Sequence, residues 1–174
     1  MQQPFEQMID RYGSRLRHLA LMLLGRGDEA DDVVQDTLIK LWHRGDDVRR
    51  DDALPWLLTC TRNACLDRLR HRQRTQSLTL KLVGEQSVQA DVQSTLNPDE
   101  AIDVQRRRGL LLAALAEMPE PGRSLLILRD MQELDVAQTA KTLELSRTQV
   151  KVYTFRARRL LRKKIEEELH EQVA

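Results

Sequence analysis

The residues of this 174-residue chain that are best suited to chemistry are cations, and they gather in two blocks. Residues 62–74 hold five basic side chains and one acidic one, and residues 141–164 hold nine and one, although the net charge is only +1. Compact basic blocks in a nearly neutral chain favour two separate contacts with a polyanion such as nucleic acid. The alternative is that both blocks are solvated helix faces.

The second basic block coincides with a helix-turn-helix pattern. Asp135 and Ser146 each precede a glutamine by three residues, which is the spacing of a capping box at a helix start. Residues 142–145 supply the short connection that such a motif needs. The spacing along the second helix predicts a buried stripe of Val150, Tyr153, Thr154, Ala157 and Leu161.

The opposite face of that second helix is basic and is predicted to contact DNA. In the major groove, Arg and Lys can pair with guanine edges, while Val and Phe can touch thymine methyl groups. We expect most of the arginines to hold phosphates, because most protein–DNA hydrogen bonds go to the backbone. For Phe155, packing against a neighbouring helix is the alternative. The face and its flanks comprise Thr148, Lys151, Val152, Phe155, Arg156, Arg158, Arg159 and Arg162.

The first basic block contains a second candidate DNA face. Four polar residues follow one another at spacings of three or four and therefore lie near one line on a helix. Asparagine carries both a donor and an acceptor and can read a base edge, and arginines suit phosphates. A solvated surface stripe is the alternative. The four residues are Asn63, Asp67, Arg70 and Arg74.

The helix predicted before this block has the opposite charge. Its residues 28–36, DEADDVVQD, cannot face DNA, but they stand beside Val, Leu and Trp side chains that we expect to be exposed. Such a surface is typical of protein docking. A docking helix next to a DNA-facing helix indicates an adaptor rather than an enzyme.

Catalytic and metal chemistry have little support in the sequence. No nucleophile–base pair, phosphate loop or metal-ligand cluster is apparent, and the four histidines are scattered. Cys60 and Cys65 would lie ~140° apart on a shared helix, so we expect buried free thiols rather than a disulfide. The sequence therefore predicts no enzyme activity, no metal and no cofactor.

Helical periodicity predicts an all-α protein. Aromatic residues make up only 3% of the chain, and there are only 7 Gly and 5 Pro, which suits long helices. No apolar run approaches the ~18–20 residues of a membrane span. The start, MQQPFEQMID, lacks the features of a signal peptide, so a cytoplasmic protein is expected.

The pattern predicts two small domains joined by a flexible linker. In the first, residues 1–75, we expect helices from Phe5 to Leu24, from a cap at Asp28, and from about Ala53 to Arg74. Residues 76–96 are rich in Gln and Ser and are typical of a linker. The second domain, residues 97–170, opens on NPDE, a helix start with an Asn cap and Pro at the first position. Pro119 and Pro121 end that helix, and another is expected over 122–131.

The ordered motifs resemble bacterial sigma factors of the sigma-70 family, in the extracytoplasmic-function (ECF) group. The segment DEADDVVQDTLIKLW resembles the family's helix for the clamp coiled coil of RNA polymerase β′. LPWLLTCTRNACLDRLRHRQR resembles its helix for the −10 promoter element. NPDEAI and LAEMPEPGRSLLILRDMQELDVAQTAKTLELSRTQVKVYTFRARRLLRKK resemble its −35-binding domain. The match covers nearly the whole chain, in order.

The resemblance implies an alternative sigma factor that binds core RNA polymerase, directs it to promoters through −35 and −10 elements, and helps to melt the DNA. Residues 1–75 would form a sigma region 2-like bundle, and residues 97–170 a sigma region 4-like helix-turn-helix domain. The loop over 44–54 would capture a flipped base of the non-template strand, and the linker would pass near the RNA path. An anti-sigma partner, in many members membrane-bound, is also implied. The turn residue that is often Gly in this family is Glu144 here.

The resemblance also implies site residues, position by position. Contacts with core polymerase, through its β′ clamp and β subunits, would come from Asp32, Gln35, Asp36, Leu38 and Trp42. Contacts with the −10 element would come from Arg62, Asn63, Asp67, Arg70 and Arg74. Contacts with the −35 element would come from Thr148, Lys151, Val152, Phe155, Arg156 and Arg158.

Two other classes of protein are alternatives. A sigma-mimic would titrate an anti-sigma protein without touching promoters, but such mimics carry a receiver domain for which 174 residues have no room. A plain helix-turn-helix regulator would need a dimer interface or a ligand domain. It would also leave the acidic helix and the 44–54 loop without a role.

Overall fold

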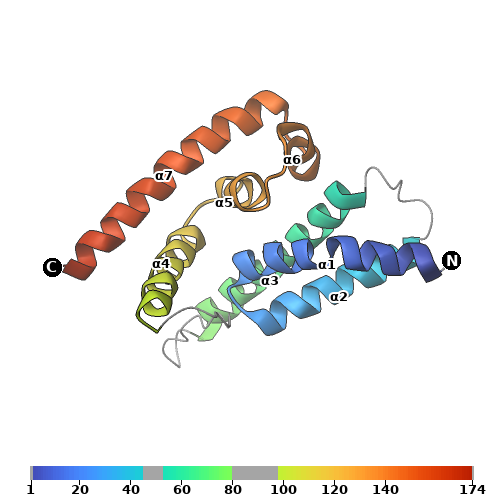
Figure 1. The fold of residues 1–174 in the computed structure, drawn as a ribbon, viewed down its shortest axis with the longest axis horizontal. Coiled ribbons are helices and arrows are strands. Elements are labelled where there is room, and N and C mark those ends of the chain that lie inside the picture. Colours follow the sequence, from blue (N-terminus) through green and yellow to red (C-terminus); the bar gives the residue numbers. More distant parts are fainter. Residues whose placement is uncertain (1, 45–52, 80–97, 174) are drawn as a thin grey trace. The chain divides into compact units, whose positions relative to one another are not determined.

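The computed structural model describes residues 2–44, 53–79 and 98–173, and the regular elements in these ranges are all helical, which confirms the predicted all-α class. The chain divides into two compact units, Met1–Ala90 and Asp91–Ala174. Among the described residues, no helix combines the length and apolarity that crossing a membrane requires. In chain order the elements are α1 (Gln2–Leu24), α2 (Gly27–Arg44), α3 (Ala53–Thr79), α4 (Pro98–Ala116), α5 (Gly122–Leu126), the π-helical turn η3 (Ile127–Met131), α6 (Val136–Leu143) and α7 (Arg147–Val173) (Figure 1).

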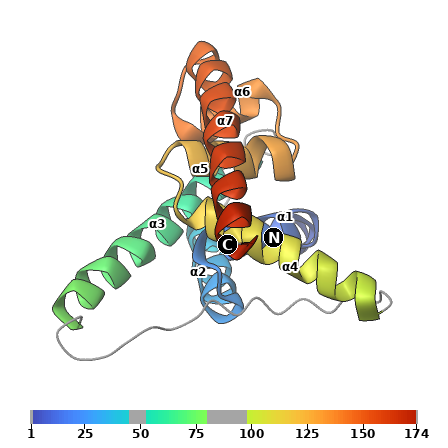
Figure 2. The same cartoon turned by 90° about the vertical axis from the view of Figure 1, so that its left-hand side faces the viewer.

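The first unit is a bundle in which α1, α2 and α3 each pack against the other two. A pair of threonines joins α2 to α3 inside it: Thr37 Oγ1 donates to the carbonyl of Val33 at 2.9 Å, and Thr61 Oγ1 lies 3.4 Å from Thr37 Oγ1. Figure 2 shows α3 projecting beyond the other two helices. Among its side chains, Leu69 is half-buried, and the buried ones include Leu54, Leu57, Leu58, Thr61 and Cys65. The fully buried core includes Leu16, Leu19, Leu23, Val33, Leu57, Leu58 and Cys65.

The turn between α1 and α2 is tighter than predicted. Gly25 adopts a positive φ of 70°, and the backbone N–H of Ala30 donates to the carbonyl of Arg26 at 3.1 Å. Because this is a helical bond across four residues, α2 begins at Gly27, and Asp28 lies within the first turn instead of capping it. The cap position is Arg26, so the expected cap at Asp28 is wrong by two positions.

The third helix is longer than predicted. It continues to Thr79, five residues past the expected end at Arg74, because TQSLT holds no Pro or Gly to stop a helix. The first part of the expected linker is thus helical. The rest of it, the proposed cap Asn97 and most of the 44–54 loop lie outside the described residues.

In the second unit, the long helix α7 packs against α4, α5 and α6. Helix α4 starts at Pro98 and ends at Ala116, as the prolines on either side predict. The single helix expected over 122–131 is instead α5 followed by η3, where the N–H of Gln132 donates to the carbonyl of Ile127, five residues back, at 3.0 Å. A π turn accommodates one residue more than an α turn, which residue periodicity does not reveal. One core cluster comprises Leu115, Met118, Leu126 and Ala157.

Candidate nucleic-acid interface

Two capping boxes start the helices of the helix-turn-helix, and both were predicted from the sequence. The carboxylate of Asp135 accepts from the N–H of Gln138 at 2.7 Å, and the N–H of Asp135 donates to the Gln138 side chain at 3.1 Å. The same reciprocal bonds join Ser146 and Gln149, at 3.1 and 2.8 Å. Each box satisfies two N–H groups that a helix start otherwise leaves unpaired. The starts of α6 and α7 are therefore fixed locally.

The turn between α6 and α7 depends on Glu144. This residue has φ 55° and ψ 40°, the left-handed conformation in which glycine is favoured. The next residue, Leu145, donates its N–H to the carbonyl of Ala140 at 3.0 Å and so closes the end of α6. The turn that usually carries Gly therefore forms with Glu, at the cost of about 1–2 kcal/mol for a side chain in this region.

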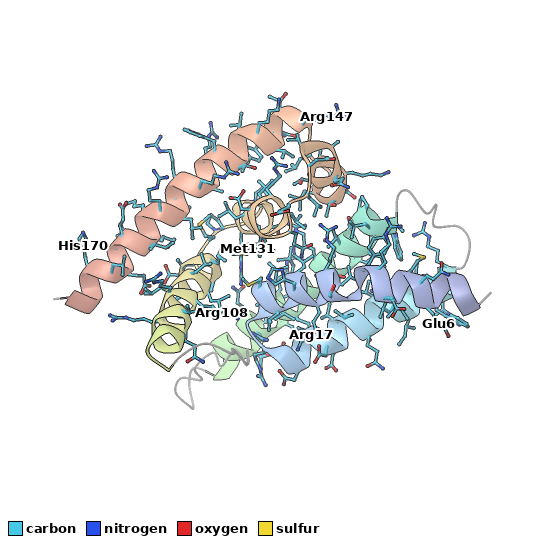
Figure 3. The ribbon with its side chains drawn as sticks, viewed as in Figure 1. Glu6, Arg17, Arg108, Met131, Arg147 and His170 are labelled. Atoms are coloured by element: carbon cyan, nitrogen blue, oxygen red, sulfur yellow. The ribbon has the colours of Figure 1, made fainter. Side chains whose placement is uncertain are left out.

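The outer face of α7 is exposed, as predicted. Phe155 is 64% exposed and Val152 is 40% exposed, so the alternative that Phe155 packs against a neighbouring helix is wrong. Figure 3 shows Arg147 and His170 near the two ends of this helix. The predicted inner stripe is buried at Val150, Thr154 and Ala157 and half-buried at Tyr153 and Leu161, and the exposed side chains include Thr148, Lys151, Arg156 and Arg159.

The cations of α7 differ in whether they have a partner. Arg158 forms two bonds with Asp130 of η3, from Nε at 2.9 Å and from Nη2 at 2.5 Å, and these bonds raise the pKa of Arg158. Lys164 pairs with Glu117 at 2.6 Å, and this hydrogen bond raises the pKa of Lys164. Within the described residues, Lys151, Arg156, Arg159 and Arg162 form no ion pair.

On α3, the residues predicted to contact the −10 element lie at the surface. Asn63, Asp67, Arg70 and Arg74 are exposed, and Arg62 is half-buried. Nη1 of Arg70 pairs with Asp67 Oδ1 at 2.7 Å, and Nη1 of Arg62 lies 3.5 Å from Asn63 Oδ1. All five residues predicted to contact the −10 element therefore lie on α3, and one of the arginines, Arg70, is held by Asp67 of the same helix.

Two other arginines of the first basic block face α2 instead of solvent. Arg68 lies 3.5 Å from both Asp32 and Asp36 and donates to the carbonyl of Glu29 at 3.3 Å. Arg72 donates to the carbonyl of Leu24 at 3.2 Å and forms an ion pair with Glu29. In the sequence, Arg68 and Arg72 both belong to the basic block of residues 62–74 that is predicted to contact a polyanion. Their spacing of four, matched to acids on the preceding helix, is the signal that could have separated them.

On α2, the residues predicted to bind polymerase lie on two sides of the helix, since Asp32 and Asp36 face Arg68 of α3. Gln35, Leu38 and Trp42 border a hollow of about 400 Å³, and Trp42 is 52% exposed. Val34 and Ile39 border it too, and sequence reasoning missed both as site residues. Ile39 is 48% exposed and stands four residues after Gln35, a helical spacing that could have found it.

Within the described part of the chain neither cysteine forms a disulfide, and only one is fully buried. Cys65 lies in the core, whereas Cys60 is half-buried, so the expectation of two buried thiols is correct for Cys65 alone. Burial raises the pKa of the Cys60 thiol, although Lys40 and Arg44 act in the opposite direction. Cys60 is therefore mostly a neutral thiol near pH 7.

Comparisons with known proteins agree with this arrangement. Family models for Sigma-70 region 2 and for Sigma-70, region 4 match residues 8–75 and 108–161. The ECF RNA polymerase sigma factor SigM of Mycobacterium tuberculosis is 33% identical over 156 residues, which cover 88% of this chain and 73% of that protein. The ECF RNA polymerase sigma factor SigW of Bacillus subtilis is 23% identical over 169 residues, which cover 94% of this chain and 90% of that protein.

A solved structure shares the fold. The sigma factor RpoE of Bartonella quintana, in complex with the anti-sigma factor NepR, matches 94% of this chain and 97% of its own with a TM-score of 0.72 and 23% identity. The matched regions coincide with the α1–α3 bundle and with the capped helices of the second unit. SigM is 33% identical to this chain over 88% of the chain and 73% of SigM, and both family models match. The chain therefore belongs to the ECF group of RNA polymerase sigma factors of the sigma-70 family.

Proposed function

We propose that this sigma factor uses α2 to bind core RNA polymerase, α3 to bind the −10 element and α7 to bind the −35 element. The observation that carries the proposal is α7 itself. Its start is fixed by a capping box, and its exposed face combines apolar side chains with cations that form no ion pair with any residue the structure describes. Such a helix suits the major groove.

In the −35 complex, α7 lies in the major groove with its N-terminal half against the bases. Val152 and Phe155 are the exposed apolar side chains that can touch thymine methyl groups. Lys151 and Arg156 supply positive charge for phosphates or guanine edges, and Thr148 stands one turn nearer the helix start. Arg158 is treated separately below, because Asp130 already holds it.

In the −10 complex, Asn63 presents an amide to a base edge, while Arg62, Arg70 and Arg74 hold the DNA backbone. The Asp67 carboxylate orients Arg70 through the 2.7 Å pair. Capture of an unstacked base offsets part of the few kcal/mol that unstacking costs, which is how binding helps melting.

The face of α2 suits a partner that offers an apolar side chain flanked by cations. The hollow of about 400 Å³ is bordered by Leu38, Ile39 and Trp42. Asp31 also borders the hollow. Asp32 and Asp36, on the side of α2 that meets Arg68, have side chains that are 67% and 59% exposed. We assign this face to the β′ clamp of core polymerase.

Binding through two units makes two weak DNA contacts act together. Once core polymerase fixes both units, the second contact forms at a high effective concentration, so that the holoenzyme binds promoters far better than the free chain. The proposed site of action is the cytoplasm, where polymerase and chromosome lie. An anti-sigma protein is a further proposed partner, supported by the complex in which the similar RpoE was solved.

Run-off transcription tests this assignment. Purified core RNA polymerase is incubated with fragments of the source genome, with and without the chain, and transcripts are mapped. We expect chain-dependent transcripts that share −35 and −10 sequences. Phe155→Ala should reduce them strongly, whereas Leu169→Ala, which removes an exposed apolar side chain elsewhere on α7, should not. Trp42→Ala should weaken core binding, with Val104→Ala on α4 as the matched control.

The two alternative classes give different results. Core binding without any chain-dependent transcript would favour a sigma-mimic. Sequence-specific DNA binding by the chain alone, without core binding, would favour a plain helix-turn-helix regulator.

A further inference from the structure

A bidentate ion pair ties the basic helix α7 to the π turn η3. Nε of Arg158 donates to Asp130 Oδ2 at 2.9 Å and Nη2 donates to Oδ1 at 2.5 Å, across 28 residues of sequence. Two parallel bonds between a guanidinium and a carboxylate fix direction as well as distance. A guanidinium held in this way has committed its Nε–Nη2 edge to the carboxylate, whose negative charge offsets the positive charge that the arginine would offer to DNA.

The position of Arg158 around α7 supports this separation. At 100° per residue, Arg158 lies about 80° from the buried Val150, whereas Phe155 and Arg159 lie about 140° and 180° from it. Arg158 therefore stands at the edge of the buried stripe, on the side that meets η3. Its side chain is 56% exposed, and that of Asp130 is 33% exposed.

The backbone that carries Asp130 is itself fixed. The Gln132 N–H donates to the Ile127 carbonyl at 3.0 Å, and the Leu134 N–H donates to the Leu128 carbonyl at 2.9 Å. Ile127 and Leu128 are fully buried, so the turn cannot rotate without disturbing the core. Asp130 is thus a rigid anchor for one flank of α7.

We propose that Arg158 is a positioning residue: its bidentate pair with Asp130 fixes the rotation of α7 against η3, and the guanidinium does not contact promoter DNA. This inference rests on the proposed role of α7 in −35 recognition. The rotation of α7 determines which bases Val152 and Phe155 reach, so the pair sets sequence selectivity without reading a base.

The first test is a double-mutant cycle on the full chain. Asp130→Asn and Arg158→Met should each lower the urea midpoint of unfolding, and the double variant should be no less stable than the weaker single variant, because the two changes remove one interaction. Arg159→Met is the matched control, since this exposed arginine forms no ion pair among the described residues. Additive losses would overturn the pairing.

The second test measures DNA binding by the holoenzyme, made from core RNA polymerase and the full chain, on duplexes that the wild type selects from a random-sequence pool. Two quantities are measured. The ratio is the affinity for a selected duplex divided by the affinity for an unselected one, and the slope is that of log affinity against log salt concentration. Asp130→Asn and Arg158→Met should each lower the ratio about tenfold, comparable with one mismatched base pair, and leave the slope unchanged. Lys151→Met is the reference and should reduce the slope by about 1.

Arg158→Lys separates positioning from a phosphate contact. Lysine keeps the charge but cannot form the bidentate pair, so we expect it to lower the ratio as methionine does. Preserved binding with lysine, a smaller salt slope with methionine, or tighter DNA binding by Asp130→Asn would each overturn the inference while leaving the proposed function intact. A wild-type holoenzyme that selects no sequence would overturn the proposed function and the inference together.

Discussion

The two long basic helices, α3 and α7, are both 27 residues long but use their cations differently. In α3, Arg68 and Arg72 turn toward the acids of α2, and Arg70 is held by Asp67 on its own helix. In α7, Arg158 and Lys164 are paired, while most of the cations on the outer face have no ion pair within the described residues. A count of basic residues in a stretch of sequence therefore overstates how many cations are available to DNA, because some of them are held by acids of the same protein. The overstatement is larger for α3 than for α7.

The helices also differ in how much of their surface is buried. Leu57 and Leu58 of α3 are fully buried, whereas the buried residues in the stripe of α7 are the smaller Val150, Thr154 and Ala157. In Thr154 the hydroxyl oxygen is buried without a hydrogen-bond partner among the described residues. We therefore expect α3 to contribute more to stability and α7 more to binding.

The largest expected effect is on the core of α3. Leu57→Ala should lower the free energy of unfolding of the first unit by about 2–5 kcal/mol, because it leaves a cavity in a packed bundle. Urea denaturation followed by circular dichroism measures the change. Leu169→Ala on α7, where the side chain is exposed, is the control and should change the free energy by less than about 0.5 kcal/mol. Equal losses would contradict the comparison.

The next effect separates a cation that faces α2 from one that faces solvent. Arg72→Met should lower the free energy of unfolding by about 1–2 kcal/mol, because it removes bonds to Leu24 and Glu29, and should leave the salt dependence of DNA binding unchanged.

Arg156→Met on α7 should do the reverse. It should leave the urea midpoint unchanged and reduce the salt slope of promoter binding by the holoenzyme by about 1. If Arg72→Met reduces the slope as much as Arg156→Met does, the distinction between the two helices fails.

A smaller effect compares the two turns. Glu144→Gly should raise the free energy of unfolding by about 0.5 kcal/mol, since glycine relieves the left-handed strain but has more conformational freedom in the unfolded chain. Gly25→Ala in the first unit, at φ 70°, should lower it by about 1 kcal/mol. Thermal unfolding of each variant measures both changes. A loss of stability in Glu144→Gly would show that the Glu side chain itself stabilises the turn.

The smallest effect concerns pH. A hydrogen bond from the Glu29 N–H, followed by one from Arg26, holds the pKa of Asp28 below its ordinary value. The contribution of Asp28 to stability is therefore present above the ordinary carboxyl pKa and is lost as the pH falls through the lowered one, below about pH 4. Asp28→Asn should make the free energy of unfolding depend less on pH below about pH 4, which urea midpoints at several pH values measure. An unchanged acid limb would count against these hydrogen bonds.

Local signals predicted much of the second unit. The capping boxes at Asp135 and Ser146 and the inner stripe around Val150 depend on residues within one or two turns of each other, so their spacing is enough. The family resemblance extended these elements to a whole architecture. Glu144 shows that a helix-turn-helix can form even where the residue at its turn departs from the usual one.

What could not be predicted depends on contacts between distant residues. The inward direction of Arg68 shows only when α3 is compared with the acids of α2, and the pairing of Arg158 depends on Asp130 in a π turn 28 residues earlier. Neither is visible in the periodicity of one helix. The extension of α3 to Thr79 is not predicted because residues 75–79 have no sustained apolar period, although they also hold no Gly or Pro to oppose a helix.

The π turn at Ile127–Met131 restricts how the length of this gene product can change over evolution. A one-residue deletion there would return the turn to α geometry and swing Asp130 by about 100° around the helix, away from Arg158. Lineages that lose this residue would then carry an unpaired cation beside the exposed face of α7. Among descendants of this sequence, a gap within 127–131 should therefore co-occur with a substitution at position 158.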